Sequence, residues 1–202
     1  MKRYMIGILL CLGLTSMNEA WGQSANVTKL ETAFENEELT GAQLQAFELR
    51  ALQKLNDLAS YIEVMGNNAL SPRLRDQATE QFLTLFSDSS RTILFPGLKN
   101  VPTVIKAHEL AKSISGLSLE SVSAKVSQQK VTRHFKRQSE RQYAAVAACK
   151  MAYSFLDAGG KVRSNIAISY QVQLVLSRKE KQFGQHIKEI WEVSLGDVRS
   201  LD

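Results

Sequence analysis

Cysteine and proline are scarce in this chain, which has two cysteines and three prolines in 202 residues. Cys11 lies in an N-terminal apolar run, so removal of that run would leave Cys149 as the single thiol. An intramolecular disulfide is then excluded, and stability must come from a buried apolar core. Cys149 is expected to be a small buried residue, because no histidine or acid is tied to it by spacing.

Signatures of metal, phosphate and cofactor binding are also missing. The three histidines, His108, His134 and His186, are far apart and match no metal-ligand spacing. Gly159-Gly160 falls in a turn between two extended segments, whereas a phosphate loop lies between a strand and a helix. The sequence therefore predicts no metal site and no cofactor.

The charge balance is mildly basic, with 25 Lys and Arg against 20 Asp and Glu and a net charge of +5. The hydrophobic fraction of 44% and the charged fraction of 22% are ordinary for a globular protein, so disorder of the whole chain is excluded. Such an excess suits an anionic partner but is too small for a dedicated nucleic-acid binder. No nucleic-acid partner is expected.

The N-terminal segment has the pattern of a secretory signal peptide. Lys2 and Arg3 precede an apolar run over residues 5–14, and the small residues Ala20 and Gly22 place a cleavage site after residue 22. The run is shorter than the ~20 residues that a membrane-spanning helix needs, so no membrane span is expected in the mature chain. We expect export to the periplasm or the extracellular side of a Gram-negative bacterium. Residues 23–39 are expected to form a flexible lead, and residues 40–199 a single α+β domain.

Three helices are predicted from capping signals and apolar periodicity. A capping box of Thr40 with Gln43 begins the first, and Gly66, expected in the left-handed conformation, ends it. The second begins at Ser71-Pro72, with Leu74 on its buried stripe, and a third is expected from about Thr103.

Strands are predicted where apolar and polar residues alternate. The predicted strands span about 91–95, 119–126, 143–156, 162–177 and 186–195. A charged turn is expected at residues 178–181, and residues 128–142 are left open between strand, helix and loop. Helices followed by a run of antiparallel strands indicate an α+β domain whose sheet curls around the first helix.

This order of elements resembles the cone-shaped fold of the NTF2-like superfamily. The pattern is most similar to exported, uncharacterised bacterial members, through the segments at residues 61–67 (YIEVMGN) and 191–198 (WEVSLGDV). The resemblance implies N-terminal helices packed on a curved antiparallel sheet that ends in a β-meander. The superfamily includes isomerases, dehydratases, hydrolases, transport factors and secretion scaffolds, so the fold alone does not decide the function.

A catalytic candidate is Glu189, which lies between the apolar residues Ile187 and Trp191 on the last strand. A carboxylate inside a cone would be an acid or base, with Tyr153, Tyr170 and Trp191 as ligand-binding neighbours. The alternative is a Glu189 that reaches solvent or pairs with an arginine, because glutamate is rarely buried without a partner.

A basic segment is the candidate partner surface. Its cations are Lys130, Arg133, Lys136, Arg137 and Arg141. They suit an anionic envelope polymer, phosphate-bearing lipids or an acidic protein patch. The alternative is a solvated edge strand whose charges prevent aggregation.

Three functions fit these patterns. The first is a non-catalytic envelope module that binds a small apolar ligand or a protein partner. The second is an enzyme for a small substrate with Glu189 as acid or base. The third is a scaffold subunit of a secretion or conjugation assembly, which would self-associate through the sheet.

Overall fold

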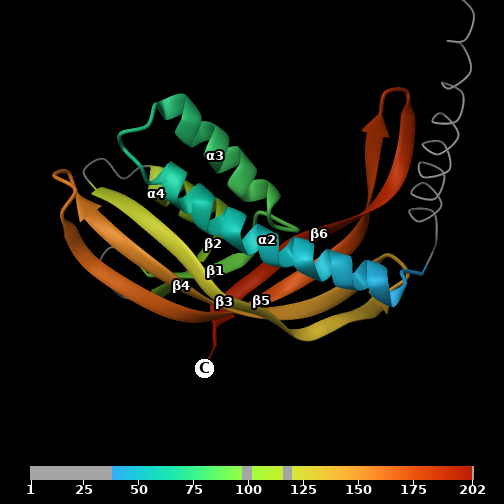
Figure 1. Ribbon diagram of the computed structural model, residues 1–202. Coiled ribbons are helices and arrows are strands. Elements are labelled where there is room, and N and C mark those ends of the chain that lie inside the picture. Colours follow the sequence, from blue (N-terminus) through green and yellow to red (C-terminus); the bar gives the residue numbers. More distant parts are fainter. Residues whose placement is uncertain (1–37, 97–101, 116–119, 202) are drawn as a thin grey trace, which may run out of the picture. The chain divides into compact units, whose positions relative to one another are not determined.

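The computed structural model describes residues 38–96, 102–115 and 120–201. The predicted signal peptide, residues 1–22, and all but the last two residues of the predicted lead lie outside these ranges. Within them the elements follow the order α2 (Gly41–Met65), α3 (Pro72–Thr84), β1 (Thr92–Pro96), β2 (Pro102–Lys106), α4 (Ala107–Ser115), β3 (Glu120–Ser139), β4 (Gln142–Asp157), β5 (Val162–Phe183) and β6 (His186–Ser200) (Figure 1).

The first helix, α2, begins where its capping box predicts. The Thr40 hydroxyl accepts from the Gln43 backbone, and the Gln43 side chain accepts from the Thr40 N–H. Gly66 caps the other end with φ −85°, so the predicted left-handed conformation is wrong. The glycine is needed for close approach instead, because a Cβ there would lie 2.2 Å from Val122 Cγ1 of β3. A side chain would push the helix end off the sheet.

The third helix begins later than predicted, because a short strand precedes it. β2 pairs antiparallel with β1, and α4 starts only at Ala107, whose N–H donates to the Arg91 carbonyl at 2.8 Å. Five residues are too few for apolar periodicity to separate a strand from a helix, and the pairing with β1 decides between them. Val104 is consequently exposed, as is Leu74, which the sequence placed on the buried stripe of the second helix.

The domain is α+β, with helices followed by a curved, open sheet of six strands in the order β2-β1-β6-β5-β4-β3. Strands β3 to β6 form the predicted antiparallel meander. The sheet as a whole is mixed, because β1 runs parallel to β6 at Ile93 and Val198. The sheet is mixed because β1 comes from the helical part of the chain and joins β6 without a hairpin.

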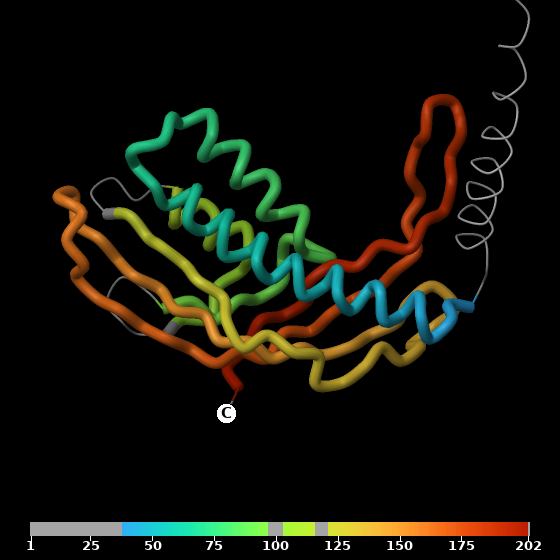
Figure 2. The backbone as a smooth tube through the Cα atoms, viewed as in Figure 1, coloured from blue at the N-terminus to red at the C-terminus, as the bar shows by residue number. Residues whose placement is uncertain are grey.

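The last two strands are longer than predicted, and their tip forms an arm over residues 179–190. The predicted turn at residues 178–181 is wrong, since β5 continues to Phe183 and turns at Gly184-Gln185. Gly184 has φ +62°, which suits the first central position of a type II′ hairpin. Residues 180–189 are all exposed, and the tube in Figure 2 shows the arm leaving the curve of the sheet.

The open question about residues 128–142 is answered by β3 and the start of β4. β3 continues to Ser139 beside β4, with register irregularities between Ser127 and Ser139. Its edge position and these bulges explain why alternation is lost there.

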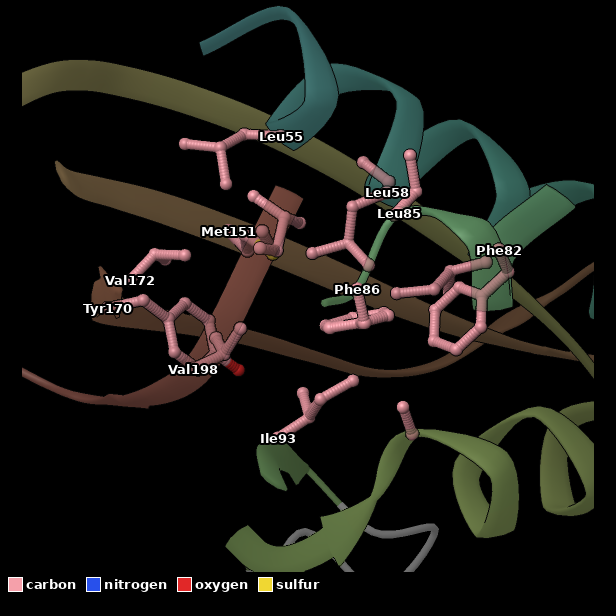
Figure 3. Close-up of a cluster of buried hydrophobic side chains, with 14 of the residues drawn as sticks. Leu55, Leu58, Phe82, Leu85, Phe86, Ile93, Met151, Tyr170, Val172 and Val198 are labelled. Carbon is pink, nitrogen blue, oxygen red and sulfur yellow. The ribbon is translucent and has the colours of Figure 1, made fainter. Parts of the chain in front are cut away.

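The core lies between α2 and the concave face of the sheet, where α2 contacts β3 and β6. Figure 3 shows buried side chains from both layers and from α3 and β1, among them Leu55, Leu58, Phe82, Leu85, Phe86, Ile93, Met151, Tyr170, Val172 and Val198. Side chains fill this concave face, so the curvature of the sheet lets it pack closely around α2.

Stability is expected to fall in alkaline solution. Burial raises the pKa of the Cys149 thiol to about 11, and burial raises the pKa of the Tyr153 hydroxyl well above its usual value. In the unfolded chain these groups lose protons near pH ~8.5 and ~10, so above those values the unfolded state binds fewer protons and folding weakens as pH rises. The contribution is complete below about pH 8 and is lost toward pH 11 and above.

Urea midpoints measured across this pH range test that expectation. Cys149→Ala should show a shallower fall between about pH 8.5 and 11 than the unchanged chain. An identical slope would contradict a contribution of the thiol.

Candidate functional site

A cleft of about 680 Å³ lies on the side of the sheet away from α2. In β4, Tyr143 and Cys149 belong to the core cluster, so the alternate residues Ala144 and Val146 point to the opposite face. The cleft is lined by Arg133, His134, Lys136, Gln138, Ala144, Ala145, Val146, Gln171, Gln173, Asp197 and Arg199. Four consecutive strands, β3 to β6, therefore contribute to it.

The hollow follows from side-chain size in neighbouring strands. Ala144 and Val146 are short and form the floor. Lys136 is the β3 partner of Ala144, and Arg133 is the β3 partner of Val146. Gln173 of β5 pairs with Val146 on the other side. Long polar side chains thus flank a small apolar strip.

The lining carries an excess of positive charge. Arg133, Lys136 and Arg199 contribute three cations against the single carboxylate of Asp197. Arg199 lies 3.0 Å from that carboxylate, whereas within the described part of the chain Arg133 and Lys136 have no carboxylate partner. Two cations are therefore available to a ligand.

Asp197 is held by hydrogen bonds that join β6 to β1. Its Oδ1 accepts from the Thr92 N–H at 3.0 Å and from the Thr92 hydroxyl at 3.1 Å. Burial alone would raise the pKa of this carboxyl, but the hydrogen bonds from Thr92 and Arg199 outweigh it and lower the pKa. Asp197 thus stays ionised and orients Arg199.

A buried glutamate supports the irregular part of β3 beside the cleft. Glu48 of α2 accepts from the Phe135 backbone N–H at 3.2 Å and lies 3.0 Å from His134 Nδ1. The Glu48 side chain is 9% exposed and the His134 side chain 81%. The carboxylate satisfies a backbone donor that the bulged strand leaves without a ladder partner.

Sequence reasoning missed Glu48, although the signal was present. Glu48 comes four residues after Leu44 and three before Ala51, so it lies on the apolar stripe of the first helix. A charged residue on a buried stripe needs a partner, and here the partner is the backbone of β3.

Glu189 does not take the inward orientation that the catalytic candidate needs. Glu189 lies in the exposed arm and forms ion pairs with Arg141 and with Arg178, the latter at 3.4 Å. Its neighbour Ile187 is 68% exposed, because this part of the strand extends past the core. Alternation of polar and apolar residues indicates two faces but not that either is covered. The alternative interpretation, pairing with an arginine, is confirmed.

The three predicted ligand-binding aromatics lie in the core and do not line the cleft. Tyr153 and Tyr170 are 1% and 0% exposed, and the Tyr170 hydroxyl donates to the Tyr153 hydroxyl at 3.3 Å. The Trp191 ring packs edge-on against Tyr143 at 5.3 Å, with the Arg178 guanidinium 5.2 Å from its centroid. Their neighbours are other side chains of the domain.

The basic segment separates into cations with different surroundings. Arg133 and Lys136 line the cleft. Arg137 pairs with Glu38, and Arg141 pairs with Glu189. Lys130 is exposed and does not line the cleft. Arg133 and Lys136 both reach the cleft because they pair with Val146 and Ala144 of β4. Their position in the basic run does not show this.

Among the described residues no group of three or more histidine, cysteine or acidic side chains could hold a metal ion. The helices in this part of the chain include none that is long and apolar enough to cross a membrane.

Comparison with known proteins gives likenesses of structure only. The sequence matches no protein-family model and no curated protein. Among solved structures, a candidate scytalone dehydratase from Novosphingobium aromaticivorans is 12% identical, with 80% of this chain and 92% of that chain covered and a TM-score of 0.38. A periplasmic fragment of TraM is 9% identical, covering 73% and 95%, with a TM-score of 0.40.

A third likeness is to a hexachlorocyclohexane dehydrochlorinase, LinA type 2. It is 9% identical and covers 76% of this chain and 90% of that chain, with a TM-score of 0.30. At these scores the three likenesses say nothing about a site, and the α+β description rests on the helices and strands themselves.

Proposed function

We propose that this protein is an exported, non-catalytic binding module, NTF2-like in fold, that holds an anionic envelope polymer in the cleft of β3 to β6. One observation carries the proposal: Arg133 and Lys136 flank the same small apolar floor without a carboxylate partner in the described residues. Two such cations raise the local concentration of an anion and form charge-assisted hydrogen bonds with it.

The rest of the lining suits an acidic polysaccharide. Gln138, Gln171 and Gln173 each offer a donor and an acceptor, as hydroxyl groups require. Ala144 and Val146 add a small apolar contact for a sugar ring. A volume of about 680 Å³ is within the range of small-ligand sites, and an open cleft lets a chain continue beyond it.

This proposal replaces the small apolar ligand with an anionic one. Tyr153 and Tyr170, which were expected to contact an apolar ligand, are enclosed by the core. The hydrophobic face of the sheet is covered by α2, and the cleft is on the polar face. Charge is therefore the main source of affinity at this site.

Binding of polygalacturonate, an acidic polysaccharide, tests the proposal, with neutral dextran as the reference. The unchanged chain should bind polygalacturonate and not dextran, and should bind less tightly as salt is raised. Arg133→Gln and Lys136→Gln should each weaken binding by about tenfold, because each removes a hydrogen bond to a charged group.

Lys150→Gln is the matched control. Lys150 is an exposed cation on the same face of β4 as Ala144 and Val146, but it does not line the cleft. Its loss should change affinity less than twofold, since exposed charges interact weakly across solvent. Equal binding of both polymers, or equal effects of all three substitutions, would contradict the proposal.

A further inference from the structure

The arm of residues 179–190 ends in two apolar side chains that the domain does not cover. Phe183 is 52% exposed and Ile187 is 68% exposed. Phe183 pairs with His186 next to the turn, and Ile187 pairs with Gln182 one position further back. Figures 1 and 2 show this tip standing clear of the helices and of the rest of the sheet.

We infer that the arm is a membrane-surface anchor that inserts its tip into the headgroup region of a bilayer containing anionic lipid. The inference rests on the arm and does not depend on the cleft. It concerns contact with one surface of a bilayer, not a span.

The two apolar side chains lie on opposite faces of the arm. Successive pairs of a hairpin alternate between its faces, so the pair Phe183 and His186 faces away from the pair Gln182 and Ile187. A flat protein surface would cover only one of the two apolar groups. A lipid interface surrounds an inserted tip, and therefore removes both from water.

A pair of lysines follows at the depth where lipid phosphates would lie. Lys181 and Lys188 are directly opposite each other, two residues back from Phe183 and His186. At ~3.4 Å per residue they lie about 7 Å behind the tip, and interfacial segments bury their apolar groups ~5–10 Å deep. Long lysine side chains can then reach the phosphate level.

The two lysines also face each other across the ladder of the arm. Like charges directly opposite in a ladder are unfavourable, and a phosphate between them would relieve the repulsion. Lys181 lies 3.5 Å from Glu192, and side-chain exposures of 48% and 27% leave this ion pair accessible to a competing phosphate.

The acids of the arm lie behind the lysines. Glu180 and Glu189 form the next pair, further from the tip, and Glu189 is paired with Arg141 and Arg178. From the tip inward, the arm therefore carries apolar side chains, then lysines, and then acids close to arginines. An anionic bilayer surface favours this order, because apolar groups enter the interface and lysines reach the phosphates.

Cosedimentation of the full chain with lipid vesicles tests the inference. We expect binding to vesicles of equimolar phosphatidylglycerol and phosphatidylcholine, and much weaker binding to pure phosphatidylcholine. Phe183→Ser should weaken binding by about tenfold, because it removes the larger apolar group from the tip. Lys181→Gln and Lys188→Gln should each weaken it about fivefold.

Two controls separate the arm from other surfaces. Val104→Ser removes a similarly exposed apolar residue, 65% exposed, from β2, and should leave vesicle binding unchanged. The double variant Arg133→Gln, Lys136→Gln should lose polygalacturonate and keep the vesicles. If the arm variants sediment like the unchanged chain, or if Val104→Ser weakens binding as much as Phe183→Ser, the arm is not a lipid anchor.

A second measurement reads insertion directly. Tryptophan at the tip, introduced as Phe183→Trp, should show fluorescence quenching by lipids that carry a quencher near the headgroup. Val104→Trp should show none beyond that of the unchanged chain. Quenching equal at both positions would overturn the inference and leave a protein partner as the alternative for the arm.

Discussion

Replacing Tyr170 by alanine is expected to lower the free energy of unfolding by about 3–5 kcal/mol. The side chain is fully buried, and Figure 3 shows its ring beside Val172 and Val198 in the packed cluster. Truncation would leave a cavity in the core between the sheet and the helices and remove the donor to the Tyr153 hydroxyl. Urea denaturation with a shared m-value measures the change.

Tyr170→Phe is the control that separates packing from hydrogen bonding. It keeps the ring, and the Tyr153 hydroxyl keeps its contact with the Met151 sulfur at 3.3 Å. The expected cost is about 1 kcal/mol. A Tyr170→Ala variant as stable as the unchanged chain would instead fit a ligand-binding wall, because residues that face a pocket contribute little to folding.

Replacing Glu48 by alanine is expected to cost about 2–3 kcal/mol of folding stability. The substitution leaves the buried Phe135 N–H without its acceptor and removes the partner of His134. It should also loosen the bulged part of β3 that carries Arg133 and Lys136, so affinity for polygalacturonate should fall with it. Thermal unfolding and binding measured on one preparation test both effects.

Two substitutions identify which contact of Glu48 matters. His134→Ala should cost less than about 1 kcal/mol, because the histidine side chain is mostly exposed. Glu48→Gln keeps an acceptor for the Phe135 N–H and should lose less than Glu48→Ala. If His134→Ala is as destabilising as Glu48→Ala, the backbone contact is not the main role of the carboxylate.

Much of the secondary structure follows from local chemistry. The capping box of Thr40 and Gln43 begins α2, and it is predictable because both of its hydrogen bonds join residues only three positions apart. The meander is visible in the alternation of β4 to β6, and the turn at residues 157–160 forms between β4 and β5 as predicted. Local signals were insufficient where pairing decides, as at β2 and in the bulges of β3.

The candidate site was less predictable than the strands that build it. The basic run at residues 130–141 was visible, but Arg133 and Lys136 are selected by their partners in β4 and joined by Arg199 from β6. Arg133 and Arg199 are 66 positions apart in the chain, and the order of the strands in the sheet brings them to the same cleft. Glu189 shows the converse, since its apolar neighbours indicate a strand face and cannot show whether that face is covered.

The sequence by itself determined the scarcity of cysteine, the expected N-terminal export signal, the α+β order and the faces of the meander, because these depend on residue type and short-range spacing. Only the tertiary structure decided which faces are covered. The arm projects away from α2 and from the rest of the sheet, so the same alternation gives a buried Tyr170 in the middle of β5 and an exposed Phe183 at its tip. Whether a strand face is buried depends on the elements that pack on it, and the residues of the strand alone do not show this.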